Sequence, residues 1–461
     1  MRGKALGGLW VALTCAASVA TAAEAHVYAF AGWVLVAALH TGLGLRSGPA
    51  LPARAMRLGA LVAAIILLAG PPAFSGDVYR YLLDGRLSAA GLHPFAYAPE
   101  SPKIADILAT LPGEVNHPHL PTIYPAGAQA LFGLVGLLGG GTLLWRLILA
   151  ALLIPAAVAL RRQDAVGALP RDLAIAAHPL LLISLFSDGH IDALAVPIGV
   201  GLTWAIGQKR LREVGLWIGA GASLKLFPIG FPAALLGAWG LRRSLTAGLI
   251  AALSLAALYA PLVTLGPKTL GSLGTYAETW RYNAGAEALV SAGVARALEA
   301  RGTPEVFEAE RRSARNARRG VTRVIDGAPT AQAYVTREQR AASITRGLAL
   351  ALLLGLAGWA WRMSWGPART LHALVLWLFL TSPVVHPWYL LWLLPWTAEV
   401  RNRAGWVWCG AVVLAFAAPA FEASTGAWRD AVEVRVVQYA VVFGALVFDS
   451  TAKRHLVSER S

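Results

Sequence analysis

The chain of 461 residues is 57% hydrophobic and only 14% charged, too few charged side chains to cover the water-facing surface of a soluble domain of this size. Its formal net charge of +15 comes from short clusters of Lys and Arg between long apolar runs, a pattern typical of cytoplasmic loops in membrane proteins. Composition therefore argues against a soluble protein and against a nucleic-acid partner, and it predicts a chain that crosses the lipid bilayer many times.

The N-terminal residues predict a membrane hairpin. Arg2 and Lys4 precede an apolar run at 6–23, as in a signal peptide, but a second apolar run at 26–45 follows at once. We therefore expect the first run to remain as a membrane helix. The turn 22–25 contains neither Lys nor Arg, so we place it outside the membrane.

Basic loops alternate with apolar runs along the rest of the chain, and together they predict about 14 membrane helices. After the hairpin, the predicted spans lie near 57–73, 142–160, 172–187, 191–208, 212–226, 228–241, 244–264, 346–361, 370–383, 388–399, 404–420 and 433–450.

The apolar stretch 124–138 decides the orientation of every later loop. If it spans the membrane, the basic loop 161–171 lies outside. If it is re-entrant or lies on the membrane surface, that loop lies inside, together with the basic segments at 208–212, 242–243, 362–369, 401–403 and 453–454. The basic loop 46–57 lies inside in either case. The second arrangement places far more positive charge in the cytoplasm, so we predict it.

Four segments lie outside on this arrangement. The loop 74–141 mixes polar and apolar residues and is expected to fold, whereas the Arg-rich segment 265–345 is expected to be partly disordered. The turns 187–192 and 382–389 complete the outer face. We accordingly divide the chain into four parts: an N-terminal hairpin (1–56), a core (57–264), the outer segment (265–345) and C-terminal helices (346–461).

The loop 74–141 opens with the densest group of ionisable residues in the chain. Asp77, Arg80 and Asp84 are spaced to share one face of a helix. Ionisable residues at the ends of spans are costly to bury and are candidates for a functional site. The alternative is a structural Asp–Arg pair that caps the loop, which is the favoured interpretation for Asp84.

The stretch Asp77-Val-Tyr-Arg-Tyr-Leu-Leu-Asp-Gly-Arg-Leu, followed by His93-Pro-Phe, resembles the first-loop signature of GT-C fold glycosyltransferases that use polyprenyl-phosphate sugars, in particular the bacterial mannosyltransferase-like branch. Further segments resemble the family's motifs in the family's order, with His178 and Ile191 each standing where the family has Asn; they begin at Tyr124-Pro125, His178-Pro179, Ser187-Asp188, Leu224-Lys225, Tyr276 and Ser382-Pro383. The resemblance covers roughly residues 57–400.

The resemblance implies an all-α, GT-C-type bundle of about 12–14 transmembrane helices with a folded first extracytoplasmic loop. It implies an inverting hexosyltransferase of the plasma (inner) membrane that works on the extracytoplasmic face without a cofactor. The sugar, mannose before others, would pass from a polyprenyl-phosphate carrier to a glycan or glycolipid acceptor. Asp77 would be the general base that takes the proton of the acceptor hydroxyl.

The phosphate that leaves the sugar is best stabilised by fixed positive charge in a site of low dielectric constant. The resemblance assigns this role to Arg146, Lys225 and His386. The residues themselves leave other roles open, because a Lys in an apolar helix can extend to the membrane interface and a buried His is often structural.

The resemblance also implies a set of substrate-binding residues: Tyr79, Arg80, Asp84, Arg86, Tyr124, His190 and Asp192. His190 and Asp192 could instead be two ligands of a metal ion. Without a further cluster of His or Cys we predict no metal site.

Two other classes of membrane protein remain as alternatives. A secondary transporter would carry inverted repeats and ionisable residues near the middle of interrupted spans, and neither is evident here. An acyltransferase or polymerase of envelope lipids would use a similar outer cleft, and only the order of the motifs argues against it.

Overall fold

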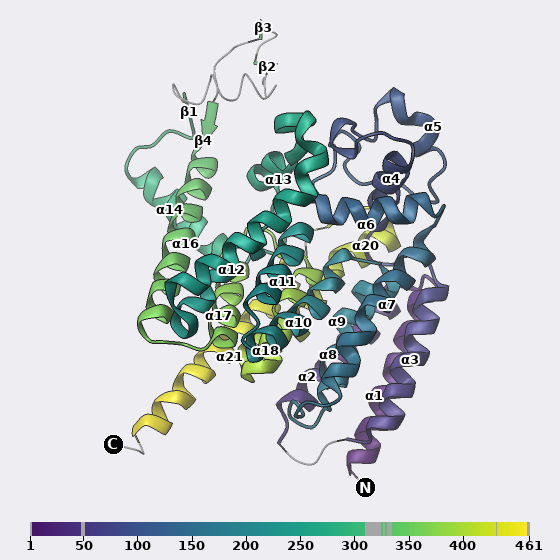
Figure 1. Ribbon diagram of the computed structural model, residues 1–461, viewed down its shortest axis with the longest axis vertical. Helices are drawn as coiled ribbons and strands as arrows, with labels where there is room; N and C mark the ends of the chain where they lie inside the picture. Colours follow the sequence, from purple (N-terminus) through teal and green to yellow (C-terminus); the bar gives the residue numbers. More distant parts are fainter. Residues whose placement is uncertain are drawn as a thin grey trace. The chain divides into compact units, whose positions relative to one another are not determined.

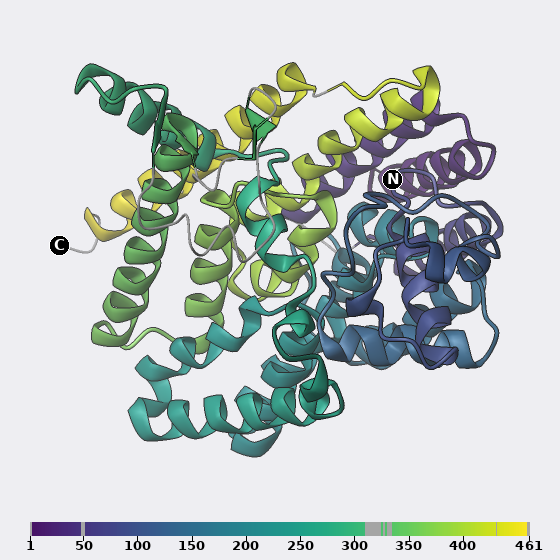
Figure 2. The ribbon, with the colours of Figure 1, turned by 90° about the horizontal axis from the view of Figure 1, so that it is seen from above.

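The computed structural model describes residues 2–47, 51–308, 324–325, 328–329, 334–429 and 431–458, most of them helical. They form two compact units (Figures 1 and 2). The first unit consists of Met1–Trp280, Ala360–Leu376 and His386–Ser461, and the second of Arg281–Trp359 and Trp377–Val385. The predicted helical fold class is confirmed.

The first unit holds every residue predicted for the functional site. Its α-helices are α1 (Arg2–Ala22), α2 (His26–Leu45), α3 (Ala53–Ala69), α4 (Asp77–Ala89), α5 (Ala105–Leu108), α6 (Ala126–Leu137), α7 (Thr142–Leu160), α8 (Arg171–Ala176), α9 (Pro179–Leu181), α10 (Ala195–Gly207), α11 (Leu211–Leu224), α12 (Leu236–Tyr259), α13 (Leu273–Thr279), α18 (Leu394–Val400), α19 (Arg403–Ala411), α20 (Ala417–Thr425) and α21 (Val432–Ser458). Short 3₁₀ and π segments join them: η1 (Pro94–Ala96), η2 (Pro102–Ile104), η3 (Leu182–Ser187), η4 (Ile191–Leu194), η5 (Phe227–Leu235), η6 (Ala260–Leu270), η7 (Pro387–Trp392) and η8 (Val412–Phe416).

The second unit contains α14 (Ala286–Ala300), α16 (Arg337–Arg362) up to Trp359 and α17 (Pro367–Leu380) from Trp377. Two short antiparallel strand pairs accompany them, with β1 (Val306–Glu308) beside β4 (Tyr334–Thr336) and β2 (Val324–Ile325) beside β3 (Ala328–Pro329). Of the segment 265–345, for which partial disorder is expected, residues 309–323, 326–327 and 330–333 lie outside the described residues.

Six helical segments of the described residues are long and apolar enough to cross a membrane: Gly3–Ala22, His26–Leu45, Thr142–Leu160, Phe227–Thr279, Arg337–Arg362 and Arg403–Thr425. They are compatible with a multi-pass membrane protein. Several other predicted spans are interrupted. The predicted span 172–187 consists of α8, α9 and the π-helix η3, and 388–399 consists of most of η7 and then α18. Proline explains part of this, because Pro179 and Pro387 each begin a new element and lack the N–H that a continuing helix requires.

The stretch 124–138 forms a short helix. α6 has 12 residues, so its length of about 18 Å falls well short of the roughly 30 Å of a bilayer core. It runs crosswise to α1, α3 and α7 (Figure 1). It packs backbone against backbone on α4, since a Cβ added at Gly85 or Gly136 would collide with the facing helix. This agrees with a re-entrant or surface-lying helix.

The loop 74–141 has an apolar core of its own, formed by Leu83, Leu87, Ile104 and Val115. Together with α6 it lies at the upper end of the first unit in Figure 1, and Figure 2 looks down on it. α4 is half-buried in this part of the unit and packs on α6.

Basic residues of the predicted inner loops meet at the opposite end of the first unit. Arg57 at the start of α3 and Arg161 after α7 both pair with Asp172 of α8, at 2.6 and 3.4 Å. Arg171 pairs with Glu399 of α18 at 2.6 Å. Loops that the charge pattern places on one side of the membrane thus contact one another.

This arrangement predicts how single cysteines will react with reagents added to intact cells. In a background lacking Cys15 and Cys409, Glu100→Cys should be labelled by a membrane-impermeant maleimide, because Glu100 is exposed in the loop 74–141. Arg162→Cys, exposed at the opposite end, should be labelled only after the membrane is permeabilised. Labelling of both positions in intact cells would overturn the predicted topology.

Candidate functional site

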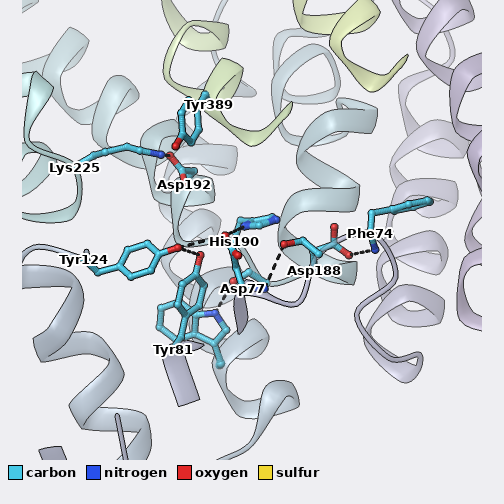
Figure 3. Close-up of polar contacts among 12 residues, drawn as sticks. Phe74, Asp77, Tyr81, Tyr124, Asp188, His190, Asp192, Lys225 and Tyr389 are labelled. Atoms are coloured by element: carbon cyan, nitrogen blue, oxygen red, sulfur yellow. Dashed lines mark hydrogen bonds and ion pairs between the residues drawn. The ribbon is translucent and has the colours of Figure 1, made fainter. Parts of the chain in front are cut away.

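Asp77 is the first residue of α4, and its side chain is 28% exposed. The hydroxyl of Tyr124 donates to Asp77 Oδ2 at 3.3 Å, and His190 Nδ1 lies 3.8 Å from the same oxygen (Figure 3). Burial raises the pKa of Asp77, and the hydrogen bond from Tyr124 opposes that rise. Asp77 is therefore an accessible carboxylate that binds a proton more readily than an ordinary aspartate.

Lys225 follows the last residue of α11 and lies next to Asp77 in the site. Its Nζ is 2.6 Å from Asp192 Oδ1, and the indole N–H of Trp392 donates to the same oxygen at 2.7 Å. Nζ also lies 3.5 Å from the centre of the Tyr389 ring, a cation–π contact (Figure 3). The largely buried cation thus has a counter-ion within the protein, as burial in an apolar helix requires.

The turn 187–192 brings His190 beside Asp77. The backbone N–H groups of Ala73 and Phe74, just before α4, donate to Asp188 Oδ1 at 3.0 and 3.2 Å. The indole of Trp145 donates to the carbonyl of Gly189 at 2.6 Å. Burial raises the pKa of Asp188 to about 6. The turn is therefore anchored both to the start of α4 and to α7.

His386 lies on the far side of Trp388 from His190. The Trp388 ring stacks on His190 with ring centres 3.6 Å apart and on His386 with centres 4.6 Å apart. Burial lowers the pKa of both histidines, that of His386 to about 3, so both rings are neutral at physiological pH. Trp388 and Trp392 are not among the residues singled out from the sequence; their place beside the His386-Pro motif was the signal that could have identified them.

Arg146 does not join this cluster, which corrects its predicted role at the phosphate. The side chain is buried, and its Nη1 donates to four backbone carbonyls, those of Leu67, Gly70, Phe186 and Ser187, at 3.0–3.2 Å. The guanidinium thus fastens the end of α3 to η3. The guanidinium group carries five N–H donors, so it suits binding to several fixed carbonyls better than binding to a mobile ligand.

The other predicted residues of α4 hold the loop 74–141 together. Arg80 donates to the carbonyls of Asn116, His117 and Leu120. Arg86 donates to the hydroxyl of Thr110 at the exposed surface, and Tyr79 packs against the apolar core of the loop.

Asp84 is buried and accepts a hydrogen bond of 2.8 Å from Gln129 of α6. Its predicted structural role fits this position better than its predicted place at the substrate. Burial raises its pKa to about 6.

Two further observations bear on ligands. Within the residues that the structure describes, no group of three His, Cys, Asp or Glu side chains is arranged to hold a metal ion. An apolar pocket of about 270 Å³ lies between α2, α20 and α21 and shares no residue with the cluster around Asp77.

No family model, curated protein or solved structure matches the chain. The chemistry of the site must therefore be inferred from its own residues.

Replacing Arg146 should destabilise the fold. Arg146→Ala leaves buried carbonyls without this donor, at a cost of about 2 kcal/mol. Thermal unfolding in detergent measures the loss, with the exposed Arg162→Ala as control. An Arg146→Ala protein of normal stability that no longer binds donor would return this residue to the phosphate site.

The buried carboxyl of Asp84 should make stability depend on pH. Its pKa rises from 3.8 to about 6, so the folded chain holds this proton more tightly than the unfolded chain, and stability falls as pH rises through that window. Asp84→Asn cannot ionise. From about pH 4 to about pH 7, the variant should therefore gain on the order of 2 kcal/mol relative to the wild type. Thermal unfolding across this range tests it, and a constant difference would contradict it.

Proposed function

We propose that the protein is a GT-C-type glycosyltransferase with a bundle of about 12–14 transmembrane helices. It moves a hexose, mannose before others, from a polyprenyl-phosphate carrier to a glycan or glycolipid acceptor on the extracytoplasmic face of the plasma (inner) membrane. The observation that carries the proposal is the partly exposed Asp77 carboxylate, close enough to the partly exposed Lys225 for the two charges to interact, at the end of the bundle opposite the basic loops.

The proposed reaction is a single displacement at the anomeric carbon of the sugar. The acceptor oxygen attacks this carbon, its proton passes to Asp77, and the bond to the phosphate oxygen breaks with its electron pair leaving on the phosphate. The raised pKa of Asp77 supports this role, because a stronger base removes the hydroxyl proton more readily. Activity should accordingly fall as pH drops through the pKa of Asp77.

Lys225 is the cation proposed to face the leaving phosphate. Its side chain is 26% exposed, so a ligand can approach it although Asp192 and Tyr389 hold it from within. Such a fixed charge needs little reorganisation when negative charge develops on the phosphate. His386, stacked on Trp388 and neutral, would contribute a hydrogen bond rather than a charge.

The position of the charges also bears on the transporter alternative. The ionisable residues of the cluster lie at the ends of helices, with Asp77 at the start of α4 and Lys225 just after α11. A transporter would be expected to hold them near the middle of the membrane. We therefore favour group transfer over transport.

Asp77→Asn should abolish most of the transfer. The amide keeps the size of the side chain but cannot accept the proton, so turnover should fall by roughly 10²–10⁴-fold while donor affinity stays nearly normal. Single-turnover transfer from a polyprenyl-phosphate sugar and a separate donor-binding measurement give the two quantities.

The matched control is Asp106→Asn, because Asp106 is exposed in α5 and away from the cluster. It should transfer at the wild-type rate. If Asp77→Asn transfers normally per folded molecule, the base lies elsewhere, and Asp192 becomes the next candidate.

A further inference from the structure

His190 is a buried histidine whose two ring nitrogens have no hydrogen-bond partner among the described residues. Its side chain is 0% exposed, and within the described part of the chain neither ring nitrogen makes a hydrogen bond. Buried polar atoms are nearly always paired, so each exception calls for an explanation. Because the ring is fully covered, direct contact with a substrate, its predicted role, is not that explanation.

The ring of His190 is nevertheless held in one orientation. Gly189 adopts a left-handed φ of +67°, and the His190 N–H donates to the carbonyl of Ser184 at 2.6 Å. Trp388 covers one face of the ring. Under these constraints Nδ1 lies 3.8 Å from Asp77 Oδ2, just beyond hydrogen-bond distance.

We propose that His190 is a positioning residue for Asp77, an inference that rests on the proposed function. In the substrate complex its Nδ1–H donates to Asp77 Oδ2, the oxygen that already accepts from Tyr124. Two donors on Oδ2 leave Oδ1 free to take the acceptor proton. The remaining gap closes as substrate seats, since catalytic hydrogen bonds are often long in unliganded enzymes.

No proton crosses to His190 in this scheme. The hydroxyl proton of the acceptor moves to Asp77 Oδ1, and His190 keeps its own proton on Nδ1 throughout. Burial favours the neutral imidazole, which carries one N–H. Three charged groups act on the pKa of Asp77: Asp192 raises it, and Lys225 and Arg80 lower it.

The choice of replacement separates hydrogen bonding from packing. The side-chain amide of Asn can reproduce a donor at Nδ1, whereas Leu fills space without one. His190→Leu should lower turnover about 10- to 100-fold with donor KM unchanged, and His190→Asn should recover most of it. If both variants lose activity equally and in step with thermal stability, His190 is a packing residue and the proposal fails.

A second measurement does not depend on transfer. A carboxyl reacts with N,N′-dicyclohexylcarbodiimide in its protonated form, so the pH midpoint of Asp77 labelling, read by peptide mass spectrometry, reports its proton affinity. With a polyprenyl-phosphate sugar bound, where His190 Nδ1–H is proposed to reach Asp77, loss of this donor in His190→Leu should raise the midpoint by about one pH unit, with exposed Asp106 unchanged.

The two proposals fail separately. If the wild-type protein transfers no sugar from a polyprenyl-phosphate carrier, the proposed function fails whatever the Asp77 labelling shows. If Asp77→Asn is inactive while His190→Leu transfers at the wild-type rate with an unshifted Asp77 midpoint, only the positioning role fails.

Discussion

The site depends on one carboxylate that never meets solvent. Asp188 is fully buried, and a single oxygen accepts the N–H groups of Ala73 and Phe74 and the hydroxyl of Ser187. These bonds join the end of a π-helix to the segment that leads into α4. Without them, the turn that presents His190 and the helix that presents Asp77 would be independent elements. Because backbone N–H donors to a carboxylate are strong, these bonds hold the turn against the segment that leads into α4.

Most of the charged residues described above bind to other parts of the chain and hold its elements together. Arg146 binds carbonyls from two elements, Asp172 holds two arginines, and Lys225 satisfies Asp192. Each group is paired because an unpaired charge in an apolar interior is very costly. Asp77 differs, since among the described residues no Lys or Arg forms an ion pair with it and its contacts within the site come through one oxygen. That contrast, rather than the presence of charge, marks it for chemistry.

Charge and hydropathy patterns were enough to predict a helical membrane protein, the grouping of the basic loops and a short helix at 124–138. They could not predict that 172–187 would break into three elements, because a proline or a π-turn leaves mean hydropathy unchanged. For the site, the motifs brought Asp77, Tyr124, His190, Asp192 and Lys225 together correctly. They misplaced Arg146, since a sequence cannot show that backbone carbonyls already occupy a guanidinium.

The close packing of α4 on α6 has a consequence for how the site tolerates change. At Gly85 and Gly136 the two backbones touch, so the separation of these helices is set by main-chain atoms rather than by side chains. Side-chain contacts can relax by changing rotamer, but main-chain contacts cannot. Asp77 begins one of these helices and Tyr124 precedes the other. The separation of the two backbones that carry Asp77 and Tyr124 is thus set in part by main-chain contact, and it depends on both glycines.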